Sequence, residues 1–235
     1  MDPARHTQVY ADLAHQYHAQ IRQILDTHCH ADHISGGTKL ATTTGGTYWV
    51  ASEEMQGSSL PFRSLTDGMT FRFGAAVMKV MTLATPGHTP GSTSFLVNDK
   101  YLLAGDTIFI SGLGRPDLGG KAREWAGLLF QTVTDKLDSL DDSTVILPAH
   151  FSDPSEINAS GFVGETYGHL REQNPLLDEK SEDTFTEAVI AQIGLTPPNY
   201  TTIVDVNRGN RKLDEVEARE LEIGPNRCAV KHLAG

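Results

Sequence analysis

The feature that most constrains this chain is a short loop crowded with metal ligands. Residues 27–37 read THCHADHISGG, which places three imidazoles and one carboxylate within six positions: His28, His30, Asp32 and His33. Imidazole nitrogen and carboxylate oxygen together suit zinc, iron, manganese or nickel, and two histidines spaced i, i+2 point to the same side of an extended backbone. Buried groups of this kind are costly unless a metal or hydrogen bonds satisfy them. The loop is therefore predicted to bind a metal.

Composition limits the class of protein. The chain has 235 residues, of which 39% are hydrophobic and 21% charged, and this predicts a single soluble domain over residues 1–235 with a C-terminal extension from about residue 151. A formal charge of −11 argues against nucleic acid or an anionic membrane as partner. Two cysteines and the lack of a long apolar span favour a cytoplasmic location.

Hydrophobic periodicity predicts an α/β protein. Apolar residues at helical spacing indicate helices over Thr7–Ala19, Lys39–Thr43, Glu124–Leu140, Gly164–Gln173 and Glu182–Ile193. Apolar or alternating runs bounded by turn residues indicate strands over Ile21–Leu25, Thr47–Ala51, Met69–Phe73, Val77–Leu83, Ser92–Val97, Tyr101–Ala104 and Thr144–Leu147. The four strands between Met69 and Ala104 are expected to form an antiparallel meander.

Three further potential ligands each follow a predicted strand. His88 lies in the loop TPGHTPGS, Asp106 in AGDT and His150 in PAH. A lone histidine is more often a hydrogen-bonded structural residue, but α/β folds gather their ligands at strand ends. One common site is therefore predicted to collect all seven groups.

These motifs together resemble the metallo-β-lactamase superfamily. The order His-x-His-x-Asp-His, Thr-Pro-Gly-His, Gly-Asp and Pro-Ala-His covers about residues 20 to 150. The resemblance implies an αββα sandwich with the metal site at one edge of its two sheets. The superfamily includes hydrolases with two metals as well as redox enzymes, so the fold alone does not choose the reaction.

The residues between the ligands are similar to those of the persulfide dioxygenases. The similarity rests on THCHADHISG, on Ser92 and on the segment Gly114-Arg115-Pro116-Asp117. It implies one Fe(II) per chain, held by His28, His88 and Asp106. His30, Asp32, His33 and His150 then orient these ligands or form a second metal site, and Asp32 and His150 are also expected to serve catalysis.

The implied reaction oxidises glutathione persulfide, or the persulfide of a similar small thiol, with O₂ to sulfite and thiol. Arg115 is the candidate for binding a carboxylate of the thiol carrier, and its alternative role is an ion pair with Asp117. Ser152 stands where the family has a tyrosine, which leaves room for a thiol other than glutathione.

Two alternatives to a complete mononuclear dioxygenase stay open. A zinc thioester hydrolase of the glyoxalase II type would use all seven ligands for two Zn(II) ions, with Asp106 as their bridge. The chain also starts with Met1-Asp2-Pro3, where the family has a strand hairpin before its Asp-Pro. The first sheet is therefore expected to lack one or two edge strands, and an open edge favours a homo-oligomer.

Overall fold

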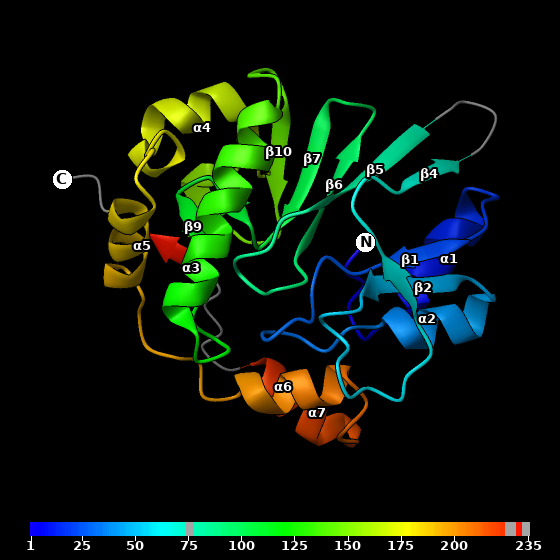
Figure 1. Ribbon diagram of the computed structural model, residues 1–235. Coiled ribbons are helices and arrows are strands. Elements are labelled where there is room, and N and C mark those ends of the chain that lie inside the picture. The colour runs from blue at the N-terminus through cyan, green and yellow to red at the C-terminus, as the bar shows by residue number, and fades with distance from the viewer. Residues whose placement is uncertain (74–77, 224–228, 232–235) are drawn as a thin grey trace. The chain divides into compact units, whose positions relative to one another are not determined.

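The computed structural model describes residues 1–73, 78–223 and 229–231, and these fall into two compact units (Figure 1). The first unit comprises Met1–Leu65 and Thr196–Arg227, and the second comprises Thr66–Leu195 and Cys228–Gly235. The predicted C-terminal extension is thus divided between them. The prediction of a single domain stays a prediction. Among the described residues, no helix is long and apolar enough to cross a bilayer.

The first unit is a small parallel sheet with helices. Its elements are α1 (Gln8–Gln16), β1 (Gln23–Leu25), α2 (Gly37–Thr44), β2 (Thr47–Ala51), β3 (Arg63–Leu65), α6 (Tyr200–Asn207) and α7 (Glu215–Glu222). The strand order is β1-β2-β3, so β1 lies at an edge of the described sheet. Its core consists of Ile24, Leu40, Tyr48, Val50 and Met55. That this sheet lacks one or two edge strands stays a prediction, as does what pairs with its edge.

The second unit is built on a six-stranded mixed sheet of order β11-β10-β7-β6-β5-β4. Its strands are β4 (Thr70–Phe73), β5 (Met78–Ala84), β6 (Thr93–Val97), β7 (Tyr101–Gly105), β10 (Val145–Pro148) and β11 (Glu165–Thr166). A small second sheet consists of β8 (Ile108–Phe109), β9 (Gly112–Gly114) and β12 (Ala229–Lys231). The antiparallel meander from β4 to β7 confirms the prediction, although Val77 lies outside the described residues.

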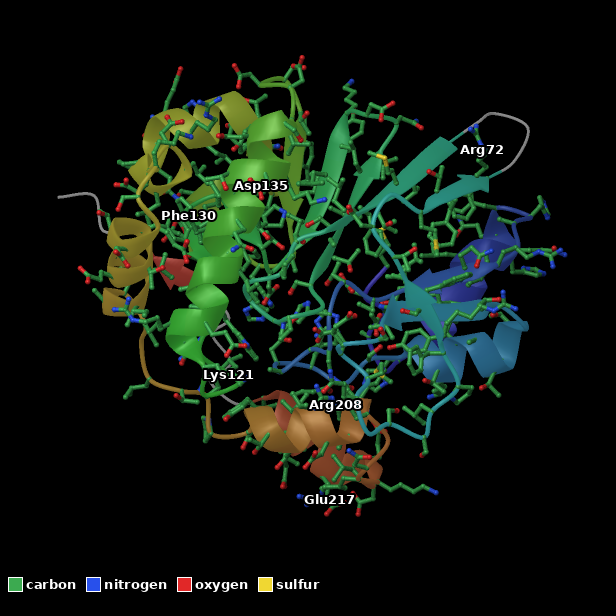
Figure 2. The ribbon with its side chains drawn as sticks, in the orientation of Figure 1. Arg72, Lys121, Phe130, Asp135, Arg208 and Glu217 are labelled. Carbon is green, nitrogen blue, oxygen red and sulfur yellow. The ribbon has the colours of Figure 1, made fainter. Side chains whose placement is uncertain are left out.

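Helices cover the mixed sheet of the second unit. They are α3 (Ala122–Gln131), α4 (Tyr167–Gln173) and α5 (Glu182–Ala191). Short helical turns occupy Thr132–Lys136, Leu137–Ser139, Pro154–Glu156 and Pro175–Leu177. α3 packs against α5, and the ring of Phe130, labelled in Figure 2, lies 5.5 Å from that of Phe185.

The helical stripe predicted for Glu124–Leu140 is a core stripe, because Leu129, Val133 and Leu137 are fully buried. The helix expected from Gly164 begins only at Tyr167, since Glu165 and Thr166 pair with β10 instead.

Candidate metal centre

The histidine loop, which we define as residues 26–36, connects β1 to α2 in the first unit. The rings of His28 and His30 lie 4.2 Å apart and both residues are at least 98% buried, at 1% and 2% exposure. The Cys29 side chain between them packs elsewhere, with its Sγ 4.0 Å from the carbonyl oxygen of Val204 in α6. The alternation expected from the i, i+2 spacing is therefore present.

His28 is held by its neighbour. Thr27 Oγ1 lies 2.9 Å from His28 Nδ1, so Nε2 is the nitrogen that this arrangement directs toward a metal. The Thr27 backbone N–H in turn donates to Asp2 Oδ1 at 2.7 Å. Asp2 therefore steadies the start of the loop, a role that the sequence analysis did not foresee.

His30 is paired with carboxylates. Its Nε2 lies 3.1 Å from Asp2 Oδ1 and its Nδ1 lies 3.8 Å from Asp32 Oδ1. Burial alone would lower the pKa of His30, but Asp2, Asp26 and Asp32 outweigh it and raise that pKa to about 10. A metal that used His30 as a ligand would have to displace a proton from its ring.

Asp32 and His33 complete a polar cluster beside His30. Asp32 Oδ1 lies 3.3 Å from His33 Nδ1, and the rings of His30 and His33 are 4.1 Å apart. His30, Asp32 and His33 each offer one ligand atom within 4.8 Å of the others. All three residues belong to the first unit. The prediction that they share one common site with the other four groups stays a prediction.

Asp26, the first residue of the histidine loop, stabilises it through hydrogen bonds. The sequence analysis did not identify this residue. Its Oδ2 accepts hydrogen bonds from Ser35 Oγ at 2.6 Å and from Tyr48 Oη at 2.7 Å. Burial raises the pKa of this carboxyl. The one signal in the sequence is its place at the end of the strand, directly before Thr27.

In the second unit, His88 has a defined tautomer. Its Nδ1 lies 2.9 Å from the carbonyl oxygen of Arg115, which can only accept, so Nδ1 donates and Nε2 carries the lone pair. Nε2 faces Asp106 Oδ2 at 3.6 Å, and both side chains are fully buried. Two ligands that each lie about 2.1 Å from one metal are separated by about 3 to 3.5 Å, so this pair fits a shared ion.

The Asp106 carboxylate lies between two imidazoles. Its Oδ2 faces His88, and its Oδ1 lies 3.4 Å from His150 Nε2. His150 differs from the other two because its side chain is 35% exposed. The three predicted ligands of this unit therefore converge, and the donor set of imidazole and carboxylate suits iron or zinc.

Buried hydroxyls join the loops that carry His88 and Asp106. Thr85 Oγ1 lies 3.0 Å from Ser94 Oγ and accepts from Thr107 Oγ1 at 3.0 Å. Close packing adds to this link, because a Cβ atom at Gly114 would lie 1.9 Å from the Asp106 carbonyl oxygen. Only glycine fits there, which explains the glycine directly before Arg115.

The guanidinium of Arg115 is buried and engaged in structural contacts. Its Nε and Nη2 donate to the two carboxylate oxygens of Asp117 at 2.7 and 2.8 Å. Nη1 and Nη2 also donate to the carbonyl oxygens of Leu195 and Gly194 at 3.0 and 3.1 Å. The contacts with Asp117 form the ion pair that the sequence analysis gave as the alternative to substrate binding. Substrate binding by Arg115 stays a prediction, and a side chain only 3% exposed argues against it.

Comparison with protein families and curated proteins identifies relatives of this site. The model of the metallo-beta-lactamase superfamily matches residues 18–150. Persulfide dioxygenase ETHE1, mitochondrial, of Homo sapiens is 32% identical over 174 residues, which are 74% of this chain and 63% of the human protein. The chain thus spans less than two thirds of that relative. Hydroxyacylglutathione hydrolase of Shewanella sp. (strain ANA-3) is 35% identical over 150 residues, 60% of this chain and 53% of the hydrolase.

Solved structures show the same fold. A metallo-beta-lactamase from Staphylococcus aureus subsp. aureus COL has a TM-score of 0.80 and 27% identity, and the match covers 91% of this chain and 66% of that one. ETHE1 from Myxococcus xanthus has a TM-score of 0.74 and 26% identity, with 89% and 86% covered. These likenesses confirm the predicted metallo-β-lactamase fold.

Proposed function

This chain belongs to the metallo-β-lactamase superfamily, and from that premise we propose that it is a persulfide dioxygenase with one Fe(II) per chain. In this proposal His28, His88 and Asp106 hold the iron, and a small thiol persulfide is oxidised by O₂. The sequence motifs and the similarity to the human and Myxococcus xanthus proteins support it. A cytoplasmic location and a homo-oligomeric state stay predictions.

The observation that carries the proposed iron site is the pair of His88 and Asp106, because His88 Nε2 faces Asp106 Oδ2 at 3.6 Å and both side chains are fully buried. A dinuclear site of the hydrolase type would also use His30 as a ligand. Asp2 Oδ1 lies 3.1 Å from His30 Nε2, which leaves Nδ1 of His30 as its possible ligand atom. Two histidines and one carboxylate suffice for non-haem iron, so the proposed site does not need His30.

The residues of the chain have distinct tasks in this proposal. A bound iron would supply the redox chemistry of oxygen transfer. The Arg115 carbonyl keeps His88 in the tautomer that presents Nε2. The Thr27 hydroxyl contacts His28 Nδ1 and so holds the orientation of that ring. Asp32 orients His30 and His33. His150 is partly exposed beside Asp106, so its Nε2 can pass a proton to solvent.

The proposed reaction is balanced with water. Glutathione persulfide, O₂ and H₂O give glutathione, sulfite and two protons, and the sulfur–sulfur bond breaks as the outer sulfur is oxidised. The thiol carrier could also be another small thiol. At the position where the family has a tyrosine, Ser152 Oγ lies 2.8 Å from Ser111 Oγ.

A dinuclear zinc thioester hydrolase is the second candidate. Asp106 lies between His88 and His150, with one oxygen toward each, as a carboxylate that bridges two metals would. His30, Asp32 and His33 form a second cluster of ligand types. The similarity to the Shewanella hydroxyacylglutathione hydrolase supports the same alternative.

Metal content separates the two candidates. Protein expressed with both iron and zinc in the medium and purified anaerobically is expected to contain about one iron per chain and little zinc, because the proposed persulfide dioxygenase holds a single iron with two histidines and one carboxylate. Elemental analysis against protein concentration measures this. Two zinc ions per chain in protein that has thioesterase activity would contradict the proposal.

A further inference from the structure

We propose that Asn207, the last residue of α6, positions the histidine loop for metal binding. This proposal rests on the metal site proposed above but concerns a residue that the ligand motifs do not include. Asn207 follows the loop by more than 170 positions in the chain, and both belong to the first unit. It is a positioning residue, since it acts on the loop's backbone.

The Asn207 side-chain amide makes three hydrogen bonds to the loop. Its Nδ2 donates to the carbonyl oxygens of His30 and His33 at 2.9 and 3.0 Å. Its Oδ1 accepts from the backbone N–H of Ser35 at 2.9 Å. Only one orientation of the amide satisfies all three, because a carbonyl cannot donate and an N–H cannot accept. Both donors and the acceptor of one side chain are thus committed to the turn that contains Asp32 and His33.

The end of α6 is fixed in place, so Asn207 cannot easily follow a moving loop. Ile203 anchors the helix in the interior at 0% exposure. Gly209, with φ +76, ends the helix, and a Cβ atom there would lie 2.6 Å from Leu60. A side chain at that position would push the helix end away from Leu60.

Arg208, labelled at this helix end in Figure 2, makes a second link to the loop. Its Nε donates to the carbonyl oxygen of Glu54 at 2.7 Å, and the Glu54 carboxylate accepts from the backbone N–H of Cys29 at 2.8 Å. Asn207 and the following residue, Arg208, therefore hold the loop on both sides of His30. Of the two, Asn207 makes the three hydrogen bonds to the backbone of the loop.

Without Asn207, two carbonyls and one N–H of the loop would turn to water, and the turn from His30 to Ser35 would gain alternative conformations. The His30 ring packs on that of His28 at 4.2 Å, so movement of the turn reaches a proposed ligand. Removing a group that directly orients a ligand costs about 10- to 100-fold in metal affinity. Asn207 acts on His28 only through the turn, so Asn207→Ala is expected to weaken metal binding by about ten-fold, the lower end of that range.

The test uses Co(II) as a probe, titrated into metal-free full-length protein and followed by its absorption spectrum. Asn199→Ala is the matched control. Asn199 Nδ2 donates to the Leu221 carbonyl oxygen at 3.3 Å, so this change loosens the α6–α7 contact and leaves the three loop hydrogen bonds in place. Asn199→Ala should bind Co(II) almost as tightly as the unchanged protein. Equal weakening in both variants would show that Asn207 matters only for the stability of the helices and would overturn the proposal.

Asn207→Asp is a second test variant. It keeps an oxygen to accept from Ser35 but has no N–H for His30 and His33, so it should bind Co(II) as weakly as Asn207→Ala. Hydrogen exchange of metal-free protein should show faster exchange at residues 27–36 in both Asn207 variants but not in Asn199→Ala. Unchanged Co(II) affinity and unchanged hydrogen exchange in both Asn207 variants would overturn the proposal. Normal Co(II) binding by the unchanged protein without dioxygenase activity would count against the proposed function alone.

Discussion

Asp106→Ala is expected to lower the affinity for iron by more than about 100-fold, beyond the roughly 10- to 100-fold that removal of an orienting group costs. Asp106 supplies the one carboxylate among the proposed ligands, and its fully buried side chain faces His88 Nε2 at 3.6 Å. Without that charge, a divalent ion would be held by neutral imidazoles alone. Iron per chain after anaerobic reconstitution and desalting measures the effect, and circular dichroism checks that the fold is intact.

The comparison variants make this result specific. Asp106→Asn keeps the volume of the side chain but removes its charge, so it should lose iron as well. His28→Ala and His88→Ala are expected to behave like Asp106→Ala, whereas His30→Ala and His150→Ala should keep much of their iron. His169→Ala is a surface control, since its side chain is 50% exposed. Equal loss of metal in the five alanine variants would indicate a dinuclear site instead. These are the variants of His28, His30, His88, Asp106 and His150.

Arg115→Ala is expected to destabilise the protein by about 3 to 5 kcal/mol, because removal of one partner leaves the other charge of a buried ion pair uncompensated. Asp117 would lose a two-pronged contact at 2.7 and 2.8 Å, and the carbonyls of Gly194 and Leu195 would lose their donors. Arg115→Lys should recover only part of this, since an ammonium cannot reproduce the planar fork. Urea unfolding of metal-free protein measures the change.

Arg123→Ala is the matched control for Arg115. The Arg123 side chain is 66% exposed and its acidic partners lie 4.0 Å away, so its loss should cost less than about 1 kcal/mol. The kinetic constants decide the remaining role of Arg115. An unchanged unfolding free energy in Arg115→Lys, together with a KM for the persulfide raised about ten-fold, would show that the guanidinium binds substrate after all.

The elements that follow from local pattern were predictable, and those made by tertiary contacts were not. The turn at Asn98 and Asp99, between two predicted strands, follows from their residue types, and both have positive φ, 52° and 53°. α6 was missed because its sequence, YTTIVDVN, is rich in β-branched residues that favour strands. Packing of Ile203 outweighs that preference. α7 carried a readable signal, the capping box of Asp214 and Glu217.

The residues of the candidate site were likewise predictable where they follow a local pattern and not where they depend on tertiary contacts. His88, Asp106 and His150 follow strands, so their convergence could be read from the chain. The hydrogen bonds of His30 with Asp2 and of the loop with Asn207 join segments far apart in sequence, and such contacts leave no periodic pattern. The Arg115 side chain illustrates the limit most clearly, because one motif allowed two roles and only the folded structure shows that the guanidinium contacts Asp117.

Oxygen consumption tests the central claim most directly. Iron-loaded protein is mixed with glutathione persulfide in an oxygen electrode, and sulfite is measured in the same sample. The proposed function predicts one O₂ consumed for each sulfite formed, with no comparable activity in Asp106→Ala or in zinc-loaded protein. Absence of oxygen uptake by the iron-loaded protein, together with rapid hydrolysis of a glutathione thioester by the zinc-loaded protein, would contradict it.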